Sequence, residues 1–482
     1  MLSAWSGPKI SAAHWVALAG ASLALLFACG CTLQPRYERP AAPVAASYPG
    51  AAGAQAGGAA AVGWRDFIHE PRLRALTEIA LVNNRDLRVA ILNVEQLQAQ
   101  YRIARSASFP AVDATAGYTR SNGSLSGGAA GGTGVLPGSS TSTAWTASVG
   151  VSAYELDLFG RVRSLNRQAL ETYLATDEAR RSTQIALVAE VATQYFALCG
   201  AEEQLALAQH TLGAVRESYE VNKATFAAGA SNELDLRAAE GQVHTAESNV
   251  QSYQRQRSTA ENGLVLLIGQ PLPAGLPPAW ALADPGPLAE VEPGLPSELI
   301  LRRADILEAE HTLKASNANI GAARAALFPQ ITLTGSVGST SPELSKLLGA
   351  GTGYWSFAPQ LTLPIFSGGR LSAQLEAAKI GQRIEVAHYE KAIQTAFREV
   401  ADALAEHESY AQQIDTEAKL AQAEQRRSEL AGLRYRAGEE SYLSVLSAQQ
   451  DLYSAQQGLL LARYNQLASR IVLYRALGGG WK

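Results

Sequence analysis

The sequence of 482 residues is poor in cysteine, in aromatic residues and in charge. Its three cysteines form neither a CxxC pair nor a Cys/His cluster, so we expect neither a zinc site nor a disulfide scaffold. Charged residues make up 17 %, the net charge is -4 and no basic block stands out, which argues against a nucleic-acid partner. GxSxG, HExxH and P-loop motifs are absent as well, so we expect no enzyme. With 7 % aromatic residues and abundant alanine, the composition favours long, closely packed helices.

Long hydrophobic runs are also missing beyond the N-terminus. No later segment is apolar over the roughly 20 residues that a membrane-spanning helix needs. Residues 1–30 have the layout of a signal peptide, with Lys9, an apolar stretch from 15 to 28 and then small residues. An uncleaved N-terminal anchor is the alternative interpretation. If the mature chain crosses a membrane, we therefore expect it to do so as strands.

Two cysteines follow the apolar stretch directly, Cys29 and Cys31 in LFACGCTLQPRYERP. A metal or redox pair is disfavoured because companion ligands are missing. A small residue before a cysteine at the end of a signal is instead the cleavage pattern of bacterial lipoproteins. Cys29 has the more typical upstream residues, whereas Cys31 follows Gly30, so both remain candidates for lipidation. Residues 31–63 then form a lipidated N-terminal tether, rich in Ala, Gly and Pro.

The rest of the chain shows an internal two-fold repeat. Pro110 in SASFPAVDATAGY aligns with Pro329 in AALFPQITLTGSV, and Gly229 aligns with Gly438. We expect a first structural repeat, a linker and a second structural repeat, at residues 64–268, 269–298 and 299–482.

Each repeat contains two segments in which apolar and polar residues alternate. These predicted strands lie near 111–119, 144–156, 330–338 and 354–366. One apolar face with aromatic residues near the strand ends is typical of outer-membrane barrels, although a soluble sandwich alternates in the same way. The smallest membrane barrels have about eight strands. Four strands must therefore be pooled with those of other copies, two chains giving eight or three giving twelve.

Helices are expected between the strands. Two long runs and four shorter ones are predicted, at 161–227 and 371–436, and at 72–106, 233–268, 299–327 and 440–477. Each long run is close to two short runs in summed length, so one long helix can pair with two short helices stacked end to end. The last helix is apolar on two sides at coiled-coil spacing, as a cylindrical wall of helices requires. A helix buried in a bundle shows the same pattern.

Four segments, in this order, resemble the TolC-like outer-membrane efflux family, in particular the OprM/NodT-type lipoproteins. They are CTLQPRYERP, GWRDFIHEPRLRALTEIALVNNRDLRVA, GLPSELILRRADILEAEHTL (with Ala304 where the family usually has proline) and RYRAGEESYLSVLSAQQDLYSAQ. The resemblance implies an α+β membrane protein that forms a homotrimer. Four strands per chain would make a trimeric 12-stranded transmembrane β-barrel, continuous with a long periplasmic α-helical barrel. Residues 269–298 would belong to an equatorial belt.

The resemblance also implies a function. The protein would be the passive exit duct of a tripartite efflux pump for drugs and other small toxic compounds. A periplasmic adaptor protein would join it to an inner-membrane RND transporter that supplies the energy. It would be anchored to outer-membrane lipid in a Gram-negative bacterium, with no cofactor besides covalent lipid. The family's spacing to Tyr37 and Pro40 favours Cys31 over Cys29 as the residue that carries a diacylglycerol and an N-acyl chain such as palmitate.

Two other functions are weaker alternatives. One is the exit duct of an ATP-driven type I protein secretion system, which the lipoprotein-like start disfavours. The other is a structural trimeric lipoprotein that transports nothing, which has no need of lipid-facing strands.

The gate of the duct would lie at the periplasmic tip, where Gly229 and Gly438 interrupt the helices. Glycine suits such turns because a helix end often needs positive φ. Ser231 or Asn232 in the first turn, and Ser441 in the second, are candidates to cap the helix that follows.

Charged residues near both turns match parts of the family's closing network. Asp235 and Tyr435 stand at matching positions, and we expect a contact between them that keeps the tunnel shut. Glu440 stands where the best-known family pattern has a basic residue. An acidic ring would therefore be built from Asp235 or from the Glu439/Glu440 pair, with Arg434 as a nearby basic partner. Solvated turn residues would show the same charges.

Overall fold

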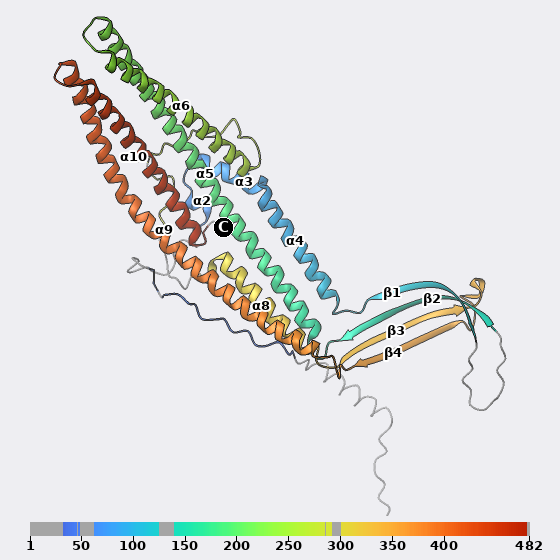
Figure 1. Cartoon of the computed structure of the whole chain (residues 1–482). Helices are drawn as coiled ribbons and strands as arrows, with labels where there is room; N and C mark the ends of the chain where they lie inside the picture. Colours follow the sequence, from blue (N-terminus) through green and yellow to red (C-terminus); the bar gives the residue numbers. More distant parts are fainter. Residues whose placement is uncertain are drawn as a thin grey trace, which may run out of the picture. The chain divides into compact units, whose positions relative to one another are not determined.

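A computed structural model describes residues 32–45, 47–48, 62–124, 139–284, 286–291 and 300–479. Its helices are α2 (Trp64–Phe67), α3 (Pro71–Asn83), α4 (Arg85–Ser106), α5 (Arg161–Ala227), α6 (Glu233–Ile268), α8 (Ala304–Ala325), α9 (Arg370–Arg436) and α10 (Tyr442–Ala476), with a 3-10 turn η2 (Leu344–Lys346). Its strands are β1 (Val112–Ser124), β2 (Ser139–Leu156), β3 (Gln330–Ser341) and β4 (Gly353–Thr362) (Figure 1). The chain is therefore a mixed helix and strand protein. The predicted signal peptide and both N-terminal cysteines, Cys29 and Cys31, lie outside the described residues.

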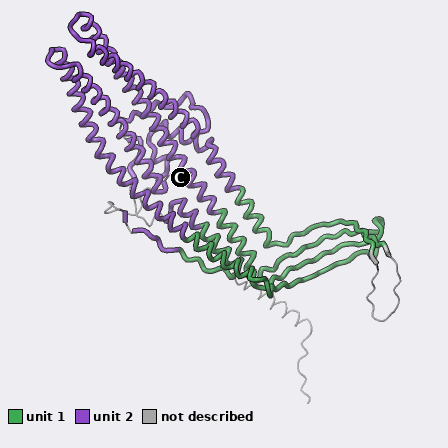
Figure 2. Tube along the Cα trace, in the orientation of Figure 1, with its two compact units in different colours: residues 1–39, 96–173, 311–386 green, residues 40–95, 174–310, 387–482 purple. Residues whose placement is uncertain are grey.

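Two compact units make up the chain (Figure 2). Unit 1 consists of residues 1–39, 96–173 and 311–386, and unit 2 of residues 40–95, 174–310 and 387–482. Each unit takes segments from both halves of the sequence. The division into two sequence repeats at residues 64–268 and 299–482 stays a prediction.

The long helices follow the predicted runs closely, and two shorter runs do not. The run 299–327 is interrupted at Arg303, and α8 ends at Ala325. Helix α5 coincides with 161–227, and α9 begins one residue before 371. The expected run 72–106 is two helices, because Asn84 adopts an extended ψ of 132° between α3 and α4. Its Oδ1 accepts the Leu87 N–H at 2.9 Å, and its Nδ2 donates to the Leu267 carbonyl at 2.9 Å. A side chain that caps a new helix start thus competes with helix continuation.

Unit 1 contains one antiparallel sheet in the order β1-β2-β3-β4. Its register places apolar residues of neighbouring strands opposite one another, since Val149 faces Val337, and Val337 faces Trp355. The exposed fraction of Val337 is 63 % and that of Trp355 is 78 %. An apolar sheet face therefore lies open in the single chain, as the alternation predicts.

The opposite face of the sheet is polar. Hydroxyl groups bond across the strands, Thr115 with Ser148 at 2.9 Å and Ser336 with Ser356 at 2.8 Å. Strand β4 ends at Thr362, before the predicted end at 366, because Pro364 has no N–H to donate to a ladder. Strands β1 and β4 are the sheet edges, and each lacks a partner on its outer side within the described residues.

Unit 2 holds the main apolar core. Its largest fully buried side chains include Trp64, Phe67, Tyr195 and Phe196, and the Phe67 ring stacks on Tyr474 with centroids 3.8 Å apart. Cys199 is free and buried in this core. Helix α5 contains a stretch long and apolar enough to cross a membrane, contrary to our expectation, but 56 % of that stretch is buried inside the structure. Burial against other helices explains its apolar character.

Candidate functional site

Two helix turns form the candidate site, and both belong to unit 2 (Figure 1). In the turn between α5 and α6, Gly229 has φ +73°, and the Ala230 N–H donates to the Thr225 carbonyl at 3.0 Å. In the turn between α9 and α10, Gly438 has φ +75°, and the Glu439 N–H donates to the Arg434 carbonyl at 3.0 Å. Both closures join residues five positions apart, which is the Schellman pattern of a helix end. Each glycine therefore occupies the position at which its turn requires a positive φ.

A side-chain cap starts each helix after its turn. The Asn232 Oδ1 accepts the Asp235 N–H at 2.9 Å at the start of α6. The Ser441 Oγ accepts the Ser444 N–H at 3.4 Å at the start of α10. Ser231, the other candidate for the first cap, has a buried hydroxyl without a hydrogen-bond partner in the described structure. Of the two candidates for this cap, Asn232 is therefore the residue that caps α6.

Tyr435 joins α9 to α5 near the turns. Its hydroxyl donates to the Asn222 Oδ1 at 2.9 Å, and its ring lies 5.4 Å from that of Tyr442. Tyr442 in turn is within hydrogen-bond distance of Ser218 on α5, at 3.3 Å between the hydroxyl oxygens. Burial first, and then the charge of Asp235, raise the pKa of Tyr435, so its hydroxyl stays a donor at neutral pH.

Asp235 makes a different contact from the one expected. Its Oδ2 accepts a hydrogen bond from the Asn232 Nδ2 at 3.0 Å, within its own turn. Among the described residues its link to Tyr435 is through charge, while the tyrosine hydroxyl is bonded to Asn222. The carboxylate at the first turn of α6 also suits the positive end of the helix dipole.

Arg434 lies beside both glutamates of the second turn. Its Nε is 3.9 Å from the Glu439 Oε2 and 3.8 Å from the Glu440 Oε2. The Ser444 hydroxyl donates to the Glu440 Oε1 at 2.7 Å. This hydrogen bond first, and also the charge of Arg434, lower the pKa of Glu440. Arg434 is therefore a basic partner of Glu440, as expected from the sequence.

Asn222 is the residue of this site that the sequence analysis missed. Its exposed fraction is 1 %, and its Nδ2 donates to the Ser218 carbonyl at 2.9 Å, so both ends of the amide are bonded. The signal for it was a polar residue within an apolar stripe on α5, between Val215 and Tyr219 on one side and Phe226 on the other. A buried asparagine in such a stripe is a known way to set the register of packed helices.

Comparisons with known proteins agree with this architecture. A family model described as outer membrane efflux protein matches residues 76–270 and 295–479. The toluene efflux pump outer membrane protein TtgC of Pseudomonas putida is 48 % identical over 457 residues, which cover 94 % of this chain and 93 % of the relative. The outer membrane protein OprJ of Pseudomonas aeruginosa is 43 % identical over 454 residues, covering 94 % and 93 %.

Solved structures give the same result. The open state of the Neisseria gonorrhoeae MtrE outer membrane channel superposes with a TM-score of 0.85 at 40 % identity, covering 94 % of this chain and 99 % of that one. The matches span the chain from the first helices to α10, and so include the sheet and both turns. The chain therefore belongs to the outer membrane efflux protein family, and it is an outer-membrane protein of an efflux system.

Proposed function

We propose that this protein is the passive exit duct of a tripartite pump that expels drugs and other small toxic compounds. The observation that carries the proposal is the sheet of unit 1, with its exposed apolar face and two unpaired edges, in a member of an outer-membrane efflux family. An apolar strand face in contact with lipid is stable, whereas open edges in lipid are not. The edges must therefore be closed by other copies.

A homotrimer closes these edges in the way that the family resemblance implies. Strand β1 of one copy would pair with β4 of the next, and three copies would give a barrel of twelve strands. Exposed apolar residues on the helices support association as well, and they include Val89 and Leu92 on α4 and Ile380 and Ile384 on α9. Pairing of these helices between copies would give the periplasmic helical barrel.

A lipid on Cys31, with Cys29 as the alternative, would anchor the chain beside its own strands. The residues that follow lie along α8 within unit 1, which also contains the sheet. The Asn317 Nδ2 donates to the Pro35 carbonyl at 2.9 Å, and Arg324 donates to the Leu33 carbonyl at 3.3 Å. The attachment of this segment to unit 1 supports a lipid anchor in the same membrane as the strands.

The helix turns are the proposed gate and the contact region for the periplasmic adaptor. The residues of this proposed region are Gly229, Gly438, Ser441, Asp235, Tyr435, Arg434 and Glu440. The bond from Tyr435 to Asn222 ties the α9–α10 hairpin to the α5–α6 hairpin. Breaking this bond would free one hairpin from the other, which is what opening of the tip requires. An adaptor that binds the turns could then bias the equilibrium toward the open form.

Relatives suggest the substrate class. Their names refer to efflux of toluene, of solvents and of antibiotics. An RND transporter of the inner membrane would capture such compounds and deliver them through the adaptor to the duct. Small apolar compounds and antibiotics are therefore the proposed cargo.

A deletion strain tests the function. Loss of the gene should increase sensitivity to toluene, dyes and antibiotics, and a plasmid copy should restore resistance. Unchanged sensitivity together with loss of a secreted polypeptide would instead support the duct of a type I secretion system. Unchanged transport of both kinds would support the structural lipoprotein.

A further inference from the structure

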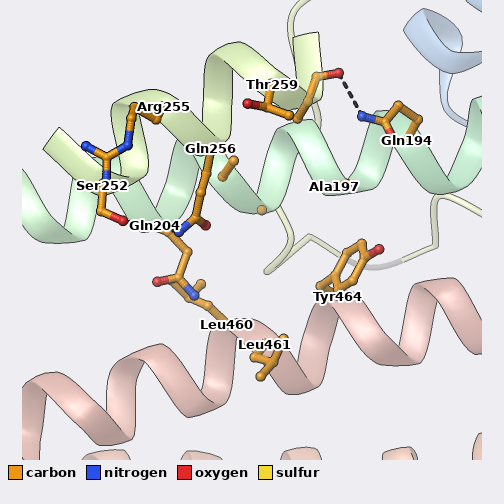
Figure 3. A pocket seen from close by; sticks show the side chains of 13 residues that line it. Gln194, Ala197, Gln204, Ser252, Arg255, Gln256, Thr259, Leu460, Leu461 and Tyr464 are labelled. Carbon is orange, nitrogen blue, oxygen red and sulfur yellow. Dashed lines mark hydrogen bonds between the residues drawn. The ribbon is translucent and has the colours of Figure 1, made fainter. Parts of the chain in front are cut away.

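A cavity of about 580 Å³ lies in unit 2 between α5, α6 and α10. Figure 3 shows side chains from these helices converging on it. Small residues on α5 leave the space open, because Ala197, Gly200 and Ala201 all line it. Volumes of 300–1,000 Å³ are typical of small-molecule sites. The space is therefore large enough for a compound of drug size.

One polar side chain that lines this cavity has an atom without a partner. The Gln204 Oε1 is buried and accepts no hydrogen bond within the described structure. Gln194, at another point of the wall, is different, because its Nε2 donates to the Ala260 carbonyl at 2.8 Å (Figure 3). A buried acceptor without a donor is unfavourable, so rotation of the Gln204 side chain toward an N–H or O–H group of a ligand would stabilise it.

A cation also lines the cavity. Arg255 makes no ion pair among the residues that the structure describes, whereas Arg257 on the same helix lies 3.2 Å from Glu202. None of the described lining residues is acidic. An unpaired guanidinium without competing carboxylates favours an anionic group on the ligand.

The side of the cavity that α10 forms is mainly apolar. Leu460, Leu461 and Tyr464 of α10 face the cavity (Figure 3), and the exposed fraction of Leu461 is 53 %. Partly exposed apolar side chains around a polar centre are the usual composition of a ligand site. A flat hydrocarbon or aromatic body would cover them.

We propose that this cavity binds an amphipathic organic anion. Arg255 would hold its carboxylate or sulfonate, the α10 residues would cover its apolar body, and Gln204 would accept a hydrogen bond from a hydroxyl or amine. The proposal concerns binding by the wall of the helices and is separate from export. Binding can be measured in a duct that transports nothing, so failure of one proposal leaves the other standing.

Calorimetric titration of the purified full-length protein in detergent tests the charge preference. The probes are 2-naphthoate and 2-naphthylmethylammonium, which share an aromatic body and differ in sign of charge. We expect the anion to bind at least about ten-fold more tightly, and Arg255→Gln to weaken it by about ten-fold. Equal binding of both probes, no binding of either, or an unchanged affinity in Arg255→Gln would overturn the proposal.

The hydroxyl preference is tested with 6-hydroxy-2-naphthoate. Its hydroxyl should raise the affinity several-fold over 2-naphthoate in the unchanged protein, and Gln204→Leu should remove that gain.

Arg237→Gln is the matched control for Arg255→Gln. Arg237 is exposed on the same helix, roughly 27 Å from Arg255 and beyond the screening length. An equal loss of affinity for the anion in Arg237→Gln would show that the effect comes from overall charge, and it would refute the site. Unchanged oligomeric size of each variant excludes misfolding.

Discussion

Asn222 and Tyr435 set the chemistry at the tip of the hairpins on the scale of single residues. The Asn222 amide is almost fully buried and uses both ends, one on its own helix and one on Tyr435 of α9. A buried amide that loses one partner costs more than an exposed one, because water cannot replace the bond. The interaction is therefore specific to one arrangement of the hairpins.

Removal of the Tyr435 hydroxyl should loosen the gate. Tyr435→Phe leaves the Asn222 Oδ1 without its donor, at a cost of about 1–3 kcal/mol to the arrangement with this bond, which we propose is the closed form. We expect a higher open probability in single-channel recordings from planar bilayers. Tyr219→Phe is the control, because Tyr219 packs in the same cluster. An equal open probability of Tyr435→Phe, Asp235→Ala and the unchanged protein would contradict the gate hypothesis.

The glycine of the second turn should be intolerant for a backbone reason alone. A Cβ on Gly438 meets nothing within 4 Å, but its φ is +75°. Gly438→Ala should therefore destabilise the turn by about 1 kcal/mol. Gly432→Ala, inside α9 and equally unobstructed, should stabilise helix α9 by up to about 1 kcal/mol. Hydrogen exchange of the α9–α10 turn would show faster exchange in the first variant and slower in the second; the same response in both would contradict the reasoning.

The four-stranded sheet is the element that decides where the chain can reside. Its strands place apolar residues on one face and hydroxyl-bearing residues on the other, and the register aligns these faces across all four strands. A bulge in β2 between Val151 and Tyr154, with Ala153 at φ 50°, changes the register near the end of the strand. Bulges of this kind bend a sheet and increase its twist, which assists closure into a barrel.

A charge on the apolar face should prevent assembly, and the same charge on the polar face should not. Val337→Asp puts a carboxylate on the face that we propose contacts lipid, whereas Ser336→Asp puts it on the opposite face. We expect much less heat-modifiable oligomer in the outer-membrane fraction for Val337→Asp and near-normal amounts for Ser336→Asp. Similar amounts of both would show that the sheet is not in lipid.

The proposed oligomer and the proposed lipid anchor belong to the scale of the whole molecule. Within the described part of the chain, both edges of the sheet are unpaired, so a single chain would be incomplete in a membrane. Native mass spectrometry of the detergent-solubilised protein should give three copies per particle. A particle of two copies would instead indicate a barrel of eight strands.

Replacement of one cysteine should abolish the lipid anchor. Mass spectrometry of the mature N-terminus should show acylation in the unchanged protein and in Cys29→Ser, and none in Cys31→Ser. Loss of acylation in Cys29→Ser alone would move the anchor to Cys29.

The sequence by itself determined the elements with the strongest local signals. The limits of α5 and α6, the two glycine turns and the alternating strands follow from apolar periodicity and from the backbone freedom of glycine. These signals depend on neighbours along the chain, which a sequence displays directly. The family resemblance added the fold and the efflux function.

Only the tertiary structure decided which distant residues meet. The pairing of Tyr435 with Asn222 rather than with Asp235, and the break of the first helical run at Asn84, depend on groups that are far apart in the chain. The same holds for the attachment of Leu33 and Pro35 to α8 and for the unpaired Oε1 of Gln204. A buried polar group takes whichever partner the packing brings within reach, and packing is a property of the whole fold rather than of any short segment.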